Sequence, residues 1–174
     1  SDSSGEVCAS EAPLTFTVDD KTRSYGAANP ALTGTITGIQ NGDPITATYV
    51  SAGAIATAPI GGYPITATLN DPTNVLGNYT VTLNTATLTV TPRTLIVTPD
   101  NQVKVFGTVF NAFTGVIAGI QAGDVITANY ASLGSPAAAA VGTYPITATL
   151  VDPGNRLGNY TVTLNVCTLT VTSR

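Results

Sequence analysis

The 174-residue sequence contains no histidine, no methionine and no tryptophan, and only 6 of its residues are lysine or arginine. Without histidine, the Ser-His and Cys-His pairs that activate nucleophiles cannot be assembled, and metal sites ligated by histidine are excluded as well. The basic residues are scattered and the net charge is −4, so no basic patch is available for nucleic acid. These absences argue against an enzyme and against a nucleic-acid partner.

Long hydrophobic runs are also missing. No stretch of about 18 apolar residues is present, so we expect no segment to insert into a membrane, and the apolar core of a signal peptide is not found. Because methionine is absent even from position 1, we interpret the chain as a processed or excised piece. Signal cleavage just before Ser1 is the interpretation we favour, and it predicts an extracellular protein that is secreted or held at the cell surface.

Charge is scarce throughout, since charged residues make up only 9% of the chain, against about 25% in an average globular protein. Threonine, alanine, valine, isoleucine and glycine dominate instead. The abundance of apolar β-branched residues distinguishes this composition from that of a disordered chain and favours β-strands.

What the chain does have is a repeat. The segment 62–91 returns at 143–172 with a constant offset of 81 residues, and the same offset places Tyr25-Gly26 on Phe106-Gly107. More than half of the aligned positions are identical, with no gap. A period of this length marks tandem modules. Enzymes seldom need two near-copies of one small domain in series, whereas spacers, stalks and fibres do.

Alternation of apolar and polar residues is strongest in the second half of each module. In Tyr63–Leu69 every second residue is apolar. The segment Tyr79–Leu83 alternates in the same way, with Val81 and Leu83 predicted to face inward, and so does Thr87–Thr91. A period of two with threonine at the outward positions is typical of half-buried antiparallel strands.

Fainter strand signals occur earlier in each module. They lie at 14–18, 32–39 and 45–50, with counterparts at 95–97, 113–120 and 126–130. Turn residues separate them, as in Asn41-Gly42-Asp43-Pro44. About six or seven short strands per module predict an all-β fold, a small immunoglobulin-like β-sandwich, with a β-grasp-like sheet as the alternative.

These signals divide the chain into an N-terminal extension at residues 1–13, a first β module at residues 14–93 and a second β module at residues 94–174. The linker between the modules is short and contains no Gly/Ser tract. We therefore expect the modules to sit end to end as a semi-rigid rod.

Several short motifs follow one another in the same order in both modules. They are Tyr-Gly or Phe-Gly, Ile-Gln-(Asn/Ala)-Gly-Asp, Gly-x-Tyr-Pro-Ile, Asn-Tyr-Thr-Val-Thr and a closing Thr-Leu-Thr-Val-Thr. This string resembles the MBG repeat, tyrosine–glycine type, of bacterial surface proteins over nearly all of residues 14–174. The resemblance implies an extracellular, all-β, tandemly arrayed module of adhesins and other large surface proteins, without catalytic residues. Phe106 departs from the pattern, and two modules are fewer than such arrays often contain.

Aspartates recur at equivalent turn positions, Asp43 with Asp124 and Asp71 with Asp152. Paired-carboxylate catalysis would need two of them about 5–10 Å apart, whereas turn hydrogen bonding alone explains their Gly-Asp and Asp-Pro contexts. Calcium at a junction between modules is an alternative, but no acidic loop supplies the roughly six to eight oxygens that calcium prefers. We predict no catalytic residue, no metal and no cofactor.

Asparagine and threonine offer two further candidate sites. Asn78 and Asn159 each begin an Asn-Tyr-Thr sequence, which matches the N-glycosylation pattern. The alternative, which we favour, is an asparagine that closes a turn before a strand. The outward Thr-x-Thr runs match an ice- or glycan-binding ladder, but threonine also suits a half-solvated strand when charges are scarce.

The two cysteines lie far apart, Cys8 in the extension and Cys167 just before the last strand. A disulfide needs Cα atoms within about 7 Å, which end-to-end modules do not allow within one chain. When the offset of 81 residues is applied to the extension, residues 1–12 align with residues 82–93. The extension would then lie beside the closing strand of a preceding copy. We therefore favour an inter-subunit Cys8–Cys167 bridge, with the extension added as a strand. An intramolecular bridge and two free thiols are the alternatives.

Together these features predict a non-enzymatic structural subunit of an extracellular filament, pilus-like fibre or adhesin stalk, which associates head to tail. The alternative is a carbohydrate- or surface-binding adhesin module, whose partner is a host or surface glycan. Tryptophan is absent and most of the 7 tyrosines are expected on inward strand faces, so the sequence offers little exposed ring surface for such a ligand.

Overall fold

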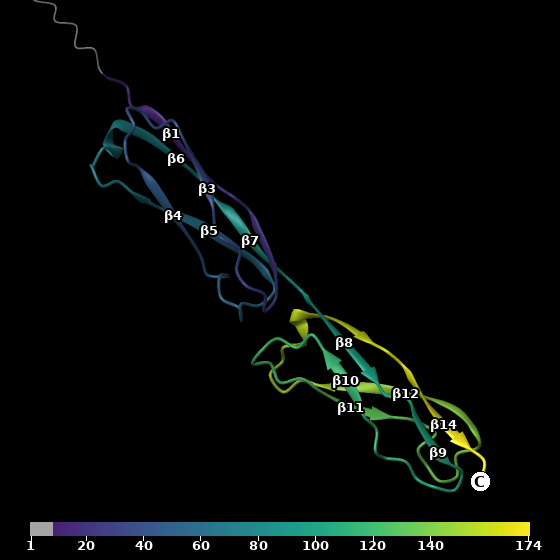
Figure 1. Ribbon diagram of the computed structural model, residues 1–174. Coiled ribbons are helices and arrows are strands. Elements are labelled where there is room, and N and C mark those ends of the chain that lie inside the picture. The colour runs from purple at the N-terminus through teal and green to yellow at the C-terminus, as the bar shows by residue number, and fades with distance from the viewer. Residues whose placement is uncertain (1–8) are drawn as a thin grey trace, which may run out of the picture. The chain divides into compact units, whose positions relative to one another are not determined.

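The computed structural model describes residues 9–174 (Figure 1). By their contacts these residues form two compact units. The first unit contains residues 9–23 and Ala27–Val90, and the second contains Ser24–Gly26 and Thr91–Arg174. The short segment Ser24–Gly26 thus belongs to the second unit, although it lies in the first half of the sequence.

Each unit contains a three-stranded and a four-stranded sheet. In the first unit, the three-stranded sheet has the order β3 (Gly34–Thr37), β1 (Ala12–Val18), β6 (Tyr79–Asn84). Its four-stranded sheet has the order β2 (Lys21–Ser24), β7 (Ala86–Thr91), β5 (Gly61–Asn70), β4 (Thr46–Ser51). In the second unit, the three-stranded sheet has the order β10 (Gly115–Ala118), β8 (Arg93–Pro99), β13 (Tyr160–Leu164). Its four-stranded sheet has the order β11 (Thr127–Ala131), β12 (Gly142–Val151), β14 (Cys167–Thr172), β9 (Gln102–Val105).

Helical structure is confined to two short 3-10 turns in the described part of the chain, η1 (Leu76–Asn78) and η2 (Leu157–Asn159). Within residues 9–174, no helix is long and apolar enough to cross a membrane. The predicted all-β fold of two tandem sandwich modules is confirmed. A β-grasp sheet would need a longer helix packed across one face, and residues 9–174 contain none.

The core of the first unit lies between its two sheets and consists of two clusters of buried side chains. The first comprises Leu14, Phe16, Ile45 and Tyr79, and the second Val18, Ile65, Ala86 and Leu88. Burial alternates along β7, with the apolar residues inside and the threonines outside or half-buried. The period-two pattern therefore identified the core face of this strand correctly.

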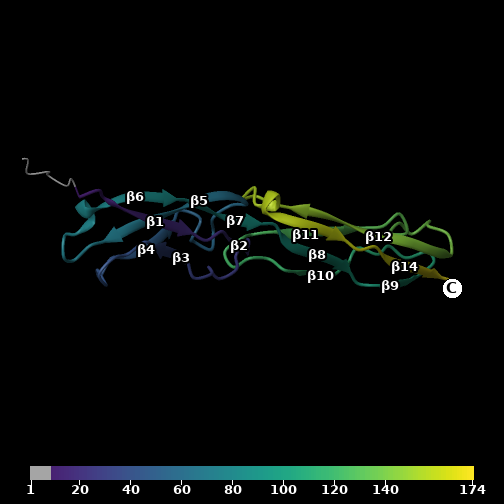
Figure 2. The same ribbon diagram turned by 90° about the horizontal axis from the view of Figure 1, so that it is seen from above.

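β6 departs from the predicted alternation. After the buried Tyr79, every residue of this strand is exposed, including Val81 at 38% and Leu83 at 49%. Val81 and Leu83 were predicted to lie on the core face of a half-buried strand, but both remain exposed because β6 is an edge strand, paired only with β1 (Figure 2). Val81 lies opposite the fully buried Leu14, so its side chain faces inward but lies at the open rim of the sandwich.

Several pairings are parallel, which corrects the prediction that the alternating segments form antiparallel strands. β1 pairs with β6 in parallel, as β8 does with β13 and β9 with β14. Parallel neighbours need a long crossover, and between β1 and β6 the chain supplies one by building β2 to β5. Alternation reveals which face of a strand is buried, but not the direction of its neighbour.

The closing strand β14 lies inside its sheet, between β12 and β9. Both edges of β14 are paired, so this strand offers no free edge to the extension of another subunit, contrary to the prediction. Ala12 and Pro13, the last residues of the extension, instead pair with the start of β6 in their own module. Residues 1–8 lie outside the described residues.

Candidate docking site

In the first unit a buried tyrosine meets the aspartate of the Gly-Asp turn. The Tyr79 hydroxyl donates to Asp43 Oδ2 at 2.5 Å and accepts the backbone N–H of Gln40 at 3.0 Å. The turn holds Asp43 in place, because the Asp43 N–H donates to the Gln40 carbonyl at 2.9 Å. Asn41 and Gly42 adopt the positive φ values, 54° and 70°, that such a turn requires.

The second unit repeats this arrangement. The Tyr160 hydroxyl donates to Asp124 Oδ2 at 2.5 Å and accepts the backbone N–H of Gln121 at 3.0 Å. The guanidinium Nε of Arg156 lies 4.0 Å from Asp124 Oδ1, at the limit of an ion pair. We call Tyr79 with Asp43, and Tyr160 with Asp124, the tyrosine–aspartate pairs.

A turn of an aromatic residue and a glycine also occurs twice. The backbone N–H of Tyr25 donates to the Thr91 carbonyl at 2.8 Å, and that of Phe106 to the Thr172 carbonyl at 2.9 Å. The glycines that follow them have φ values of 74° and 91°, which residues with a side chain rarely adopt. We call Tyr25-Gly26 and Phe106-Gly107 the aromatic–glycine turns.

In the second unit, the turn that contains Tyr25 covers the tyrosine–aspartate pair. The Tyr25 hydroxyl lies 3.0 Å from Asp124 Oδ2 and 3.2 Å from Oδ1, so it donates to this carboxylate. The Tyr25 ring packs edge-on against Tyr160, with centroids 5.5 Å apart and planes at 81°, a favoured aromatic geometry. A Cβ atom on Gly26 would overlap Gln121 Cγ. Glycine is therefore required at this turn by close approach as well as by φ.

The carboxylates affect the ionisation of these phenols. Burial, together with the hydrogen bond to Asp124, raises the pKa of Tyr160 to about 12 and also raises the pKa of Tyr25. In the first unit, the hydrogen bond to Asp43 is the main cause that raises the pKa of Tyr79. At neutral pH all three phenols are protonated and act as donors to an ionised carboxylate, which is the stronger kind of hydrogen bond.

A buried cation occupies equivalent positions in the two modules. Arg23 in the first donates to the Gly53 carbonyl at 2.7 Å and to the Ile55 carbonyl. Lys104 in the second is buried, and its Nζ donates to the carbonyls of Thr108 at 2.9 Å, Ser135 at 3.3 Å and Pro136. Each cation ties a long loop to the sandwich, so these basic residues have a structural use and do not form a ligand site.

The remaining aspartates serve turns. Asp71 Oδ2 accepts the Leu76 N–H at 2.8 Å, and Asp152 accepts the Leu157 N–H at 2.8 Å. Backbone N–H donors hold the pKa of both carboxyls below its ordinary value. Within the described residues, no three His, Cys, Asp or Glu side chains gather where a metal ion would bind.

The structure places the other candidate residues as follows. The side chain of Asn78 is exposed and that of Asn159 is buried, so of the two only Asn78 is accessible for glycosylation, which stays a prediction. Cys167 opens β14 as a half-exposed free thiol. Cys8 lies outside the described residues, and its pairing with Cys167 stays a prediction as well.

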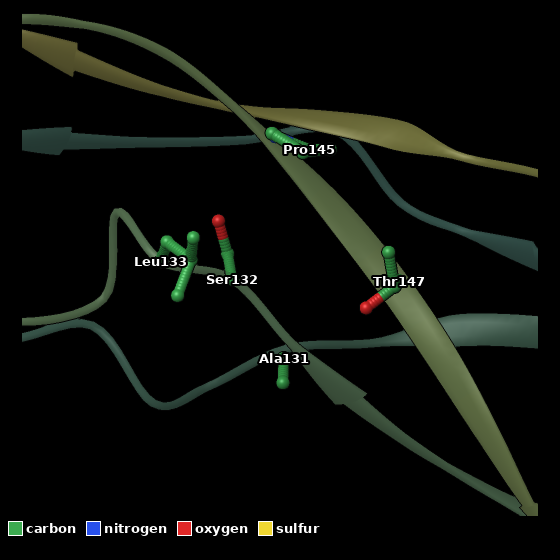
Figure 3. A pocket seen from close by; sticks show the side chains of 5 residues that line it. All are labelled: Ala131, Ser132, Leu133, Pro145 and Thr147. Carbon is green, nitrogen blue, oxygen red and sulfur yellow. The ribbon is translucent and has the colours of Figure 1, made fainter.

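A shallow hollow in the second unit is a candidate site for a small ligand. It has a volume of about 340 Å³ and lies between the end of β11 and β12, lined by Ala131, Ser132, Leu133, Pro145 and Thr147 (Figure 3). It contains no aromatic ring, and its Ser132 hydroxyl already accepts the Gly134 N–H at 3.3 Å. A specific ligand site needs several convergent polar groups, which this hollow lacks.

The domain model for the MBG domain (YGX type) matches residues 14–89 and again residues 95–170. The chain belongs to this family. Its two MBG modules thus correspond to the two repeats of the sequence. Each match ends within a few residues of the last residue of β7 or β14. No curated protein matches the sequence.

Among solved structures, the MBG chain is similar to Drosophila N-cadherin. A crystal structure of EC1-3 matches with 11% identity and a TM-score of 0.32, covering 93% of this chain and 68% of that one. A structure of EC1-4 matches with 8% identity and a TM-score of 0.29, covering 94% of this chain and 51% of that one. These scores are too low to establish a shared topology.

The tyrosine–aspartate pairs and the role of Tyr25 were not predicted from the sequence. Asp43 and Asp124 were assigned to turns, which is correct but incomplete, because each also accepts a tyrosine hydroxyl. A signal was present: the spacing of 36 residues between aspartate and tyrosine is the same in both MBG modules. It is hard to recognise because such a spacing matches no local element.

Proposed function

We propose that this chain is a non-enzymatic structural segment of an extracellular filament, pilus-like fibre or adhesin stalk. The observation that carries the proposal is the repetition of one closed MBG module, matched at residues 14–89 and 95–170. Repeated modules that each bury their own core suit a spacer, because length grows with the number of modules. The extracellular location rests on the family, whose repeats are typical of surface proteins.

The distribution of ionisable groups supports a structural role. Arg23 and Lys104 are buried against loop carbonyls, and Asp71 and Asp152 accept backbone N–H groups. Such groups cannot act as acids, bases or nucleophiles without dismantling the fold. The alternative, a module that binds a carbohydrate or a surface, would need a ligand site that the shallow hollow at Leu133 does not supply.

Head-to-tail association through a Cys8–Cys167 disulfide is part of the proposal. Cys167 lies at the start of β14 and is only partly buried, and the bridge requires its sulfur to reach Cys8 of another subunit. The bridge requires an oxidising compartment, which an extracellular protein has.

Gel electrophoresis of oxidised, concentrated protein tests the disulfide. Without reductant we expect a ladder of multimers, which collapses to one band at 17.6 kDa when reductant is added. Cys167→Ser should give that single band in both lanes. A lone monomer band from the wild-type protein in both lanes would exclude the disulfide-linked fibre and leave a segment of a longer stalk.

A further inference from the structure

The two aromatic–glycine turns differ in how far they are covered. Tyr25 is 0% exposed, whereas its counterpart Phe106 is 40% exposed. A Cβ atom on Gly26 would overlap Gln121, but one on Gly107 would meet nothing within 4 Å. One aromatic–glycine turn is thus covered, and the other is open.

The surfaces around the two tyrosine–aspartate pairs also differ in exposure. Gln121 and Asn159, which flank the tyrosine–aspartate pair of the second unit, are buried. Their counterparts in the first unit, Gln40 and Asn78, are exposed. The carboxylate of Asp43 accepts only the Tyr79 hydroxyl among the described residues, whereas Asp124 accepts two tyrosine hydroxyls.

A hollow also lies beside Gly77 and Asn78, the two residues that precede Tyr79 in the sequence. This hollow has a volume of about 260 Å³ and is lined by Ala9, Ser10, Glu11, Gly77 and Asn78. Gly77 and Asn78 belong to η1, which leads directly into Tyr79.

We propose that the tyrosine–aspartate pair of the first unit, Tyr79 with Asp43, is a docking site for the aromatic–glycine turn Phe106-Gly107 of a second copy of this chain. The occupied site in the second unit gives the geometry: the aromatic ring packs edge-on against the buried tyrosine, and the glycine lies against the glutamine. The proposal rests on the proposed function, because it describes one joint of a head-to-tail assembly.

The open turn has the backbone that this geometry needs. Phe106 donates its N–H to Thr172 as Tyr25 does to Thr91, and Gly107 has a positive φ of 91°. What Phe106 lacks is a hydroxyl, so it cannot donate to Asp43. The wild-type joint therefore relies on ring packing alone, and a tyrosine at position 106 would restore the missing hydrogen bond.

Sedimentation equilibrium over a range of concentrations, with reductant present throughout, tests the docking site. Phe106→Tyr should self-associate roughly tenfold more tightly than the wild-type chain, because the added hydroxyl donates to a carboxylate. Val103→Thr, a change at a 63% exposed residue of the adjacent strand β9, is the matched control and should leave association unchanged.

A second variant tests the docking site at Tyr79 and Asp43. Gln40→Trp places a bulky ring where Gly107 has to approach, and it retains the backbone N–H that Tyr79 uses. In the Phe106→Tyr background it should abolish the gain in association. If Phe106→Tyr sediments like the wild-type chain, or if Gln40→Trp leaves its association intact, the docking site is refuted. A disulfide ladder on the oxidised gel would in that case still support the proposed function.

Discussion

Replacing Tyr25 by alanine lowers the free energy of unfolding of the second unit by about 3–4 kcal/mol, the usual cost of removing a large buried aromatic side chain. The side chain is 0% exposed, packs edge-on against Tyr160 and donates to Asp124. Its removal opens a cavity and leaves the carboxylate with one tyrosine donor fewer.

Tyr25→Phe is the matched control, because it keeps the ring and removes only the hydroxyl. We expect it to cost about 1–2 kcal/mol, the contribution of a hydrogen bond to a charged acceptor. Urea denaturation followed by tyrosine fluorescence, fitted with separate transitions for the two units, measures both values. Equal losses for the alanine and phenylalanine variants would show that the ring makes no packing contribution.

Replacing Lys104 by methionine costs the second unit about 3 kcal/mol, although methionine has a similar length and is apolar. Lys104 is buried, and its ammonium donates to three backbone carbonyls, those of Thr108, Ser135 and Pro136. Methionine donates nothing. The Ser135 and Pro136 carbonyls keep the backbone N–H groups of Phe110 and Ala139 as donors, but all three carbonyls lose the charged donor in a place where water does not easily replace it.

The repeat itself supplies the control for Lys104. Arginine occupies the equivalent position in the first unit and donates to loop carbonyls there, so Lys104→Arg should cost less than about 1 kcal/mol. Thermal and urea unfolding of the two variants, compared with the wild-type chain, provide the test. An unchanged midpoint for Lys104→Met would mean that the loop carbonyls do not need the cation.

Much of the fold was predictable from alternation, because strands such as β5 and β7 have one face in the core and one in water. The short strands β2 and β9 were missed. Lys21–Ser24 is too short and polar to show a clear period. Gln102–Val105 alternates, but in the reverse sense, because Lys104 is buried and the two valines are exposed. The exposure of Val81 was missed for another reason. An edge position depends on strand order, which the pattern within one strand does not contain.

The candidate site was less predictable, because it depends on contacts between distant segments. The sequence marked Tyr25-Gly26 as a motif and Asp124 as a turn residue, each for a local reason. Their contact joins residues 99 positions apart, and no periodicity reports such a pairing. The substitution of tyrosine by phenylalanine at position 106 was visible, but its meaning depends on knowing which acceptor the tyrosine uses.

The pH titration of individual tyrosines tests whether a second tyrosine, Tyr25, closes the pair of Tyr160 and Asp124. Because burial and Asp124 raise the pKa of Tyr160 above its ordinary value of 10.0, the folded state keeps this proton longer than the unfolded state does. The stabilisation is fully present below about pH 10 and is lost as the pH rises toward about 12.

NMR of the chain with labelled tyrosine rings, assigned by single Tyr→Phe variants, follows each phenol separately. We expect Tyr160 to titrate near pH 12, and we expect its pKa to fall in the Tyr25→Ala variant, where the ring is uncovered. A wild-type Tyr160 that titrates near its ordinary value of 10.0, unchanged by Tyr25→Ala, would contradict this expectation.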